Sequence, residues 1–389
     1  MTEAPVPGPA AQPSFAALRH RDFRIYLFAT SAAMMADNIE HVISYWVMFE
    51  KFRSPALAGF AVLSHWLPFL FFSVYFGAMA DRFDSRRIIQ IAMLMFMAVS
   101  FAWAVLFYTD TIEVWHAAVL LVVHGMAGVL WAPASQVLIH DIVGRENIVS
   151  AVRLNATGRQ FGVFLGPAVG GGLMLLLGPA AGLLVNVLIY LPLVWWLWKA
   201  PYGTDERRQQ AGTRPGGFAD AVRTLREVSG NRTIISMIVL AGVTSLFVGN
   251  AFLAQMPEYA HDLGTEKADF SYAVLLAANA AGAFIGGIVL ESRGMLRSTP
   301  RTAIVLAIIW CFIIAGFAAT ASYPVAVALM FVGGFLSLAY TSMAQALVQL
   351  EAPAHLRGRL IGIHRSLALS SVVLLSVIAV LLAFSMRLR

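Results

Sequence analysis

The segment from Gly77 to Arg87, with the sequence GAMADRFDSRR, joins two apolar runs near residues 56–80 and 88–108. Each run is long enough to cross about 30 Å of hydrocarbon as a helix. Charged side chains are costly in lipid, so the segment is predicted to be a short loop at a membrane surface. The flanking runs predict helices, because a lone segment can satisfy its backbone groups in lipid only as a helix.

The whole composition agrees with this interpretation. Of the 389 residues, 59% are hydrophobic and 12% are charged, whereas soluble proteins carry about 25% charged residues. The mean hydropathy is +0.75. The net charge of +6 comes from arginines that are scattered between the apolar runs. Such scatter is typical of the loops between membrane spans, and it predicts no nucleic-acid partner. We expect an all-α polytopic membrane protein with the lipid bilayer as its surroundings.

Eleven membrane spans are predicted, and a long polar segment divides them into two groups. The spans lie near 24–49, 56–80, 88–108, 115–140, 152–178, 179–199, 233–258, 268–290, 302–320, 323–349 and 360–386. We expect a disordered cytoplasmic tail (1–22), an N-terminal six-helix bundle (23–199), a cytoplasmic linker with an amphipathic helix (200–232) and a C-terminal bundle (233–389). Phe218, Val222 and Leu225 would form the apolar face of the linker helix.

Positive charge predicts the orientation. With the N-terminus inside, the inner segments hold twenty Lys and Arg residues and the outer segments five. Cytoplasmic loops keep positive charge, so we expect a cytoplasmic N-terminus.

The two groups of spans show an internal repeat at an offset of 210 residues. Gly77 and Asp81 recur as Gly287 and Glu291. The offset places the counterpart of the sixth span beyond residue 389. We therefore expect eleven spans of a twelve-span architecture, with the last helix missing through truncation, or a chain with eleven native spans.

The 77–87 segment resembles motif A of the major facilitator superfamily, with Gly77, Asp81, Arg82, Arg86 and Arg87 in place. The resemblance implies two pseudo-symmetric helical bundles around a central cavity. Gly77 would allow close helix approach, Asp81 would accept hydrogen bonds from a neighbouring helix N-terminus, and the arginines would pair with acids of the facing bundle. Asp84 stands where the family commonly has Gly, which predicts a weaker latch.

The fifth span contains a glycine-rich stretch, GVFLGPAVGG, from Gly162 to Gly171. It resembles the motif of proton-driven exporters in the same superfamily. Glycines four residues apart allow tight helix packing, and Pro167 removes a backbone donor. We expect Gly162, Gly166, Pro167, Gly170 and Gly171 to pack the fifth span against a neighbour. Generic small-residue packing is the alternative interpretation.

Asp37, Glu40 and His41 lie in the middle of the first span at positions i, i+3 and i+4, which share one helical face. Ionisable groups at that depth indicate function, so they are the leading candidates for proton or substrate coupling. His124 and Arg159 join this predicted coupling group. The alternative is a neutralised cluster that only packs helices. Proton-coupled exporters usually carry Arg near the position of His124, and this chain departs from that pattern.

Other polar residues of the spans are predicted to line a substrate cavity. They are His65, Asn250, Gln255, Asn279, Tyr340 and Gln345.

The motif order and the sequence Leu154-Asn155-Ala156 resemble the drug:proton antiporter branch, which includes enterobactin exporter-like and transmembrane secretion effector proteins. This resemblance implies an exporter of small amphipathic or lipophilic molecules that works by alternating access, driven by a proton gradient, in a bacterial inner membrane. We expect a monomer without cofactor or metal, because no His and acid spacing matches a metal site. An importer of a small metabolite and a truncated non-transporting protein are the alternatives. No motif of an enzyme occurs.

Overall fold

The computed structural model describes residues 14–202, 218–248, 259, 263, 268–293 and 298–368. Within these ranges every long element is an α-helix and no strand forms. Hydrogen bonds inside each helix satisfy its own backbone, as lipid requires. The predicted all-α architecture is confirmed.

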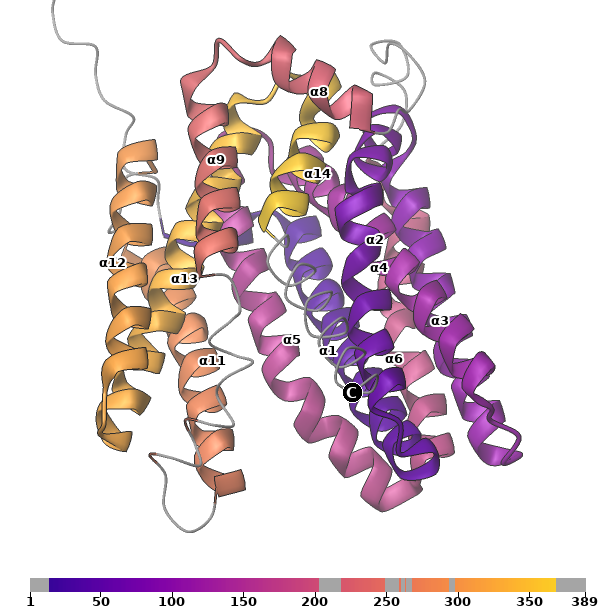
Figure 1. Cartoon of the computed structure of the whole chain (residues 1–389). Helices are drawn as coiled ribbons and strands as arrows, with labels where there is room; N and C mark the ends of the chain where they lie inside the picture. Colours follow the sequence, from indigo (N-terminus) through magenta and orange to yellow (C-terminus); the bar gives the residue numbers. More distant parts are fainter. Residues whose placement is uncertain are drawn as a thin grey trace, which may run out of the picture.

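The first half of the chain forms six long helices (Figure 1). They are α1 (Arg21–Phe52), α2 (Pro55–Arg82), α3 (Ser85–Tyr108), α4 (Val114–Val143), α5 (Ile148–Leu177) and α6 (Pro179–Lys199), preceded by the 3₁₀ turn η1 (Ala16–Arg19). Phe96 stacks on Tyr190 between α3 and α6, with ring centroids 5.8 Å apart, in the buried core of this half.

The second half forms a second group of helices. Its elements are α8 (Phe218–Glu227), α9 (Arg232–Phe247), α11 (Ala268–Arg293), α12 (Pro300–Ala319), α13 (Tyr323–Glu351), the 3₁₀ turn η2 (Ala354–Leu356) and α14 (Arg357–Ala368). In Figure 1, α9, α11, α12 and α13 lie at the left, and α8 and α14 lie at the top centre. Its core is a separate buried cluster that includes Trp310, Phe317 and Met330.

Each of the eleven predicted spans overlaps a helix among the described residues. The predicted seventh span (233–258) and eleventh span (360–386) reach past the described residues, and the chain end after which a twelfth span was expected also lies outside them. Eight described helices are long and apolar enough to cross a membrane. Helix α1 is not among these eight, because Asp37, Glu40 and His41 lower the hydropathy of its middle.

Local sequence explains where several helices begin. Ser54 caps α2 by accepting a hydrogen bond from the Leu57 amide at 3.3 Å, and Pro55 occupies the first turn. Asp84 caps α3 by accepting from the Arg86 amide at 2.9 Å. Gly178 separates α5 from α6 with a φ of 81°, a conformation that favours glycine.

Glycines set the contact between α5 and α1. A Cβ atom added at Gly162 would lie 2.8 Å from the Ser31 carbonyl oxygen, and one at Gly166 would lie 2.4 Å from the Asn38 Cβ. A Cβ at Gly170 would lie 3.2 Å from the Cα of Ile39. The α5 backbone therefore packs directly on α1, next to the turn that carries the polar residues. Gly171 has no neighbour within 4 Å of such a Cβ, so it takes no part in this contact.

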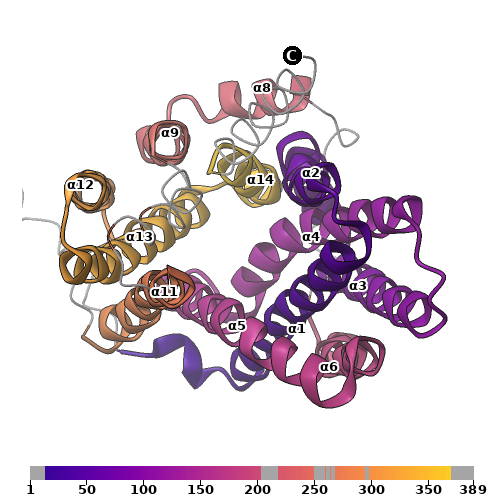
Figure 2. The same cartoon turned by 60° about the horizontal axis from the view of Figure 1, so that its bottom comes forward.

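The two halves meet through α2 against α14 and through α5 against α11 (Figure 2). A Cβ at Gly77 would lie 2.2 Å from the Gly358 carbonyl oxygen. At the equivalent place in the repeat, a Cβ at Gly287 would clash with the Thr157 hydroxyl. Both close contacts lie at the α8 end of the molecule, and their correspondence agrees with two pseudo-symmetric bundles.

Helix α8 is tied to this same end. Asp220 accepts a hydrogen bond from Arg359 Nε at 2.9 Å and also pairs with Arg223. Burial opposes ionisation of Asp220, but its bonds to Arg223 and Arg359 outweigh that cost and hold the pKa of this carboxyl below its ordinary value. The folded state therefore favours the ionised carboxylate, and the resulting stabilisation is present above the ordinary carboxyl pKa and lost in more acidic solution.

Candidate functional site

The ionisable residues of α1 form one buried cluster with histidines of two other helices. Asp37, Glu40 and His41 point from one face of α1 toward His65 on α2 and His124 on α4. The rings of His41 and His124 have centroids 4.6 Å apart, and those of His41 and His65 are 4.9 Å apart. We call these five residues the acid–histidine cluster.

His124 lies between the two carboxylates of the cluster. Its Nδ1 is 2.8 Å from Glu40 Oε1, and its Nε2 is 3.0 Å from Asp37 Oδ1. Only 3% of the His124 side chain is exposed. Because both ring nitrogens face carboxylate oxygens, the cluster can hold a proton here without a Lys or Arg partner. The ion pairs among the described residues join Asp37 and Glu40 to histidines only.

A hydrogen-bond chain supports the deeper carboxylate. Ser100 on α3 donates to Glu40 Oε2, and Asn186 on α6 donates to Ser100 Oγ at 3.1 Å. The sequence did not single out Ser100 and Asn186, since one small polar residue in an apolar span carries no distinctive signal. What marks these two residues is that their polar side chains are buried on the helix faces directed toward α1. Only the folded structure shows this.

The same cluster could hold a metal ion. His41, His65 and His124 each place a ligand atom within 4.8 Å of the others, and imidazole suits zinc and related transition metals. The expectation that the protein holds no metal stays a prediction. It rested on spacing along the chain, whereas these ligands come from three helices.

A second polar site lies at the α8 end and joins the two halves. Asp81 of α2 accepts hydrogen bonds from the backbone amides of Gly358 at 2.5 Å and Arg359 at 3.1 Å, at the start of α14. The carboxylate thus meets the amides that a helix N-terminus leaves unpaired. These contacts and the Gly77–Gly358 approach are together called the latch.

Two arginines of the 77–87 segment do not bond acids of the facing half, contrary to the sequence prediction. Arg86 bonds Asp84, with Nη2 2.7 Å from Oδ2, and donates to the Ala200 carbonyl. Arg87 donates to Gln90 Oε1 at 2.7 Å and lies over the ring of Trp198. The acid at position 84 captures Arg86 locally. Arg82 stacks on the neighbouring Phe83, with its Cζ 5.9 Å from the ring centroid.

The repeat has a matching site around Glu291 of α11. Ser150 of α5 donates to Glu291, and Arg153 Nη1 lies 3.1 Å from Glu291 Oε2 and 2.8 Å from the Leu290 carbonyl oxygen. The offset of 210 residues pointed to Glu291. Its partners Ser150 and Arg153 were not predicted as site residues, although Arg153 is an arginine close to an apolar run.

A family model described as transmembrane secretion effector matches residues 12–387 of the chain. The chain belongs to the transmembrane secretion effector family. It is 25% identical over 358 residues to the multidrug efflux pump Tap of Mycobacterium tuberculosis, which covers 88% of this chain and 83% of the relative. It is 23% identical over 185 residues to the staphyloferrin A transporter of Staphylococcus aureus, covering 45% of this chain and 47% of that protein.

Solved structures show the same fold. The major facilitator transporter FucP in the outward conformation superposes with a TM-score of 0.71 at 12% identity, covering 90% of this chain and 89% of FucP. The proton:xylose symporter XylE gives a TM-score of 0.66 at 17% identity, with 91% and 87% covered. By its family and its fold, the chain is an integral membrane transporter of the major facilitator fold and not an enzyme.

The remaining predicted site residues of the transporter do not join the cluster. Arg159 of α5 is exposed, and the ion pairs of the described residues do not join it to Asp37 or Glu40. Asn279 donates to the Met330 carbonyl oxygen at 3.4 Å, and Tyr340 lies buried beside Trp310. Gln345 is half-buried on α13, and Asn250 and Gln255 lie outside the described residues.

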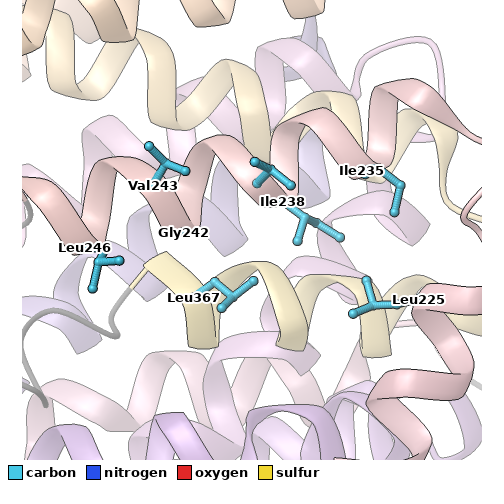
Figure 3. A pocket seen from close by; sticks show the side chains of 8 residues that line it. Leu225, Ile235, Ile238, Gly242, Val243, Leu246 and Leu367 are labelled. Atoms are coloured by element: carbon cyan, nitrogen blue, oxygen red, sulfur yellow. The ribbon is translucent and has the colours of Figure 1, made fainter.

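An apolar hollow of about 390 Å³ lies between α8, α9 and α14 (Figure 3). Its lining consists of Leu225, Ile235, Ile238, Val239, Gly242, Val243, Leu246 and Leu367. A ligand site needs a few placed polar groups to orient its ligand, and this hollow offers none. It does not compete with the acid–histidine cluster as the functional site.

Proposed function

We propose that this transporter is a proton-coupled exporter of small amphipathic or lipophilic molecules. The observation that carries the proposal is the placement of His124 between Asp37 and Glu40 in the middle of a membrane span. Charges at that depth are expensive and mark proton or substrate pathways. The names of two relatives, a multidrug efflux pump and a staphyloferrin A transporter, support transport of small molecules.

The cluster has the parts that proton exchange requires. Asp37 contacts His124 and keeps 12% of its side chain exposed, and His41, 3.8 Å away, keeps 19%. These two residues form the accessible edge, whereas Glu40 and His124 are enclosed. In the proposed cycle a proton enters at Asp37, is shared with His124, and leaves on the other side of the membrane when the two halves rearrange.

The latch supports alternating access. Asp81 with Gly358 and Arg359, and Glu291 with Arg153, hold the halves together at the α8 end. Gln349 also donates to Gln136 across the halves at 3.0 Å. Export requires this end to open while the other end closes. We propose that the α8 end lies on the cytoplasmic side of a bacterial inner membrane, since positively charged loops gather at that end. We take the working unit to be a monomer.

Asp37→Asn tests the proposal in proteoliposomes. The amide keeps the shape of the side chain but cannot take up a proton, so flux of a lipophilic dye driven by an imposed pH gradient should fall by about tenfold or more. The matched control is Asp110→Asn, which removes a carboxylate whose side chain is 88% exposed and paired with Lys51; it should leave the flux unchanged.

Two outcomes contradict the proposal. Full gradient-driven flux in Asp37→Asn removes Asp37 from the coupling step. Movement of the dye in the same direction as the protons, rather than in the opposite direction, identifies an importer.

A further inference from the structure

Three histidines of the acid–histidine cluster place their ring nitrogens close together. His41, His65 and His124 each offer one nitrogen, and these three atoms lie within 4.8 Å of one another. The ring centroids are 4.6 Å, 4.9 Å and 5.5 Å apart. A tetrahedral zinc ion with bonds of about 2.0 Å to ring nitrogens holds its imidazole centroids roughly 5 Å apart, so the three rings already have the spacing of a metal site.

Close packing of α2 on α4 fixes two of these rings. Gly125 follows His124 on α4, and a Cβ atom added there would clash with the Ser64 carbonyl oxygen and lie 3.3 Å from the Cα of His65. The backbones of the two helices therefore touch beside both histidines. Ligands held on packed helices keep their geometry better than ligands on loops.

Asp37 supplies a fourth ligand. Its Oδ1 lies 3.0 Å from His124 Nε2, and its Oδ2 lies 3.8 Å from His41 Nδ1. Neighbouring ligand atoms of a tetrahedral zinc ion with bonds of about 2.0 Å are roughly 3.3 Å apart, which is close to both distances. Asp37 and His41 are four residues apart on α1, so one helical face presents both. Three imidazoles and a carboxylate suit a transition metal, whereas Mg²⁺ and Ca²⁺ take oxygen ligands.

The surroundings of His124 orient its ring as that of a metal ligand. Its Nδ1 bonds Glu40 Oε1 at 2.8 Å, while Nε2, on the side of Asp37, has no hydrogen-bond partner among the described residues. A proton on Nδ1 leaves the lone pair of Nε2 for a metal, and a carboxylate on the far nitrogen is the usual support of a zinc-bound histidine. Ser100 and Asn186 hold Glu40 in turn.

His65 completes the set, and the set can be reached from one edge. Nδ1 of His65 is buried and has no hydrogen-bond partner in the described part of the chain, so a metal would satisfy it. The side chains of Asp37 and His41 keep 12% and 19% exposed. An ion can therefore enter past these two residues, as a metal site requires.

We propose that His41, His65, His124 and Asp37 bind one divalent transition-metal ion, with zinc as the best match. The chain was expected to hold no metal, but that expectation considered only spacing along the chain, whereas these ligands come from three helices. A ring nitrogen of His124 that binds a metal cannot bind a proton at the same time. The ion therefore excludes the exchanged proton and stops gradient-driven flux, a consequence that rests on the proposed export function.

Metal binding to the full-length transporter, purified in detergent without a histidine tag, tests the site. Chelator-treated protein is titrated with Zn²⁺ by calorimetry, and Mg²⁺ serves as the cation that prefers oxygen ligands. The wild type should bind one Zn²⁺ per chain at least about a hundredfold more tightly than Mg²⁺. Co²⁺ in place of Zn²⁺ should give the strong visible absorption of four-coordinate cobalt, which reports the tetrahedral geometry.

Variants separate this site from other histidines. His65→Gln and His124→Gln should each weaken Zn²⁺ binding at least about tenfold and remove the cobalt absorption, whereas Glu40→Gln should weaken binding about tenfold and keep the absorption. Glu40 orients a ligand without being one. His355→Gln is the matched control and should keep the wild-type affinity, since His355 is exposed and pairs with Glu227 at the α8 end. Thermal unfolding without metal shows that each variant is folded, and Zn²⁺ should raise the unfolding temperature of the wild type but not of His65→Gln.

The outcomes distinguish the metal site from the exporter proposal. Equal affinity for Zn²⁺ and Mg²⁺, or Zn²⁺ binding that both His65→Gln and His124→Gln retain, overturns the site. In proteoliposomes, saturating Zn²⁺ should lower gradient-driven dye flux about tenfold in the wild type and in His355→Gln. Undiminished flux with Zn²⁺ bound overturns the exclusion of the proton. Zinc binding that needs these histidines, in a wild type without gradient-driven flux, overturns proton coupling and leaves the metal site standing.

Discussion

Glu40 lies deeper in the acid–histidine cluster than Asp37. Its side chain is 3% exposed, against 12% for Asp37, and it contacts both His124 and Ser100. We expect Glu40 to hold His124 in position while Asp37 exchanges the proton. Glu40→Gln should therefore lower gradient-driven flux about tenfold, because His124 loses its charge-assisted hydrogen bond and keeps only the ion-pair contact with Asp37. Ser100→Ala should lower it less, since it removes a single neutral donor.

The measurement is flux in proteoliposomes with matched protein content, and Glu227→Gln is the control. Glu227 is an exposed partner of His355 at the α8 end, so losing its charge should leave flux unchanged. If Ser100→Ala costs more than Glu40→Gln, the deeper carboxylate does not position His124.

Single residues of the site were predictable only where several polar groups share one helix. The spacing of Asp37, Glu40 and His41 placed them on one face of α1, and their depth in a span marked them as functional. The structure adds Ser100 and Asn186, which are unremarkable in sequence because their role depends on the packing of α3 and α6 against α1. Arg86 went to a neighbouring acid, Asp84, rather than to the facing half, since a local partner costs less side-chain entropy to reach.

Helix α5 positions the site through its contact with α1. A Cβ at Gly166 would approach the Asn38 Cβ to 2.4 Å, next to Asp37, so Gly166→Ala must push the two helices apart or distort α1. Overpacking of this kind costs about 1–3 kcal/mol. We expect a lower thermal unfolding temperature in detergent and reduced flux.

Gly171→Ala is the matched control on the same helix. No atom lies within 4 Å of its added Cβ, and alanine favours a helix over glycine by about 1 kcal/mol, so this variant should unfold at the same or a higher temperature. Equal destabilisation by both substitutions would mean that helix propensity, and not the α1 contact, explains the glycines.

The helices themselves were largely predictable, because their apolar runs are long and their ends carry distinct signals. Span one was expected over 24–49 and α1 runs from Arg21 to Phe52. Such extensions arise because polar residues at the membrane surface continue the helix beyond the hydrocarbon. The order of the helices in space required the structure, since lipid-facing and bundle-facing apolar residues look alike in sequence.

Across the whole molecule, each half carries a glycine and an acid at equivalent positions of the interface, but the two acids have different kinds of partner. The 210-residue offset predicted that Gly287 and Glu291 correspond to Gly77 and Asp81, and both pairs lie where the halves touch. The partners differ: Asp81 accepts from backbone amides of α14, whereas Glu291 pairs with the Arg153 side chain. The repeat therefore predicts where each acid lies. It does not predict which group the acid bonds, because that group belongs to the other half and differs between the two sites.

The latch can be tested as the element that sets the balance between the open and closed α8 end. Spin labels at Arg145→Cys and Ala354→Cys, in a Cys311→Ala background, report the separation of the halves at that end, since both positions are exposed. Asp81→Asn replaces the carboxylate with a weaker acceptor for the Gly358 and Arg359 amides, so the distance distribution should gain a longer component. Asp84→Asn removes an acid of the same loop that bonds only its own half in the contacts described above, and should leave the distribution unchanged. If Asp81→Asn also leaves it unchanged, the close backbone approach of Gly77 and Gly358, rather than charge, holds this end shut.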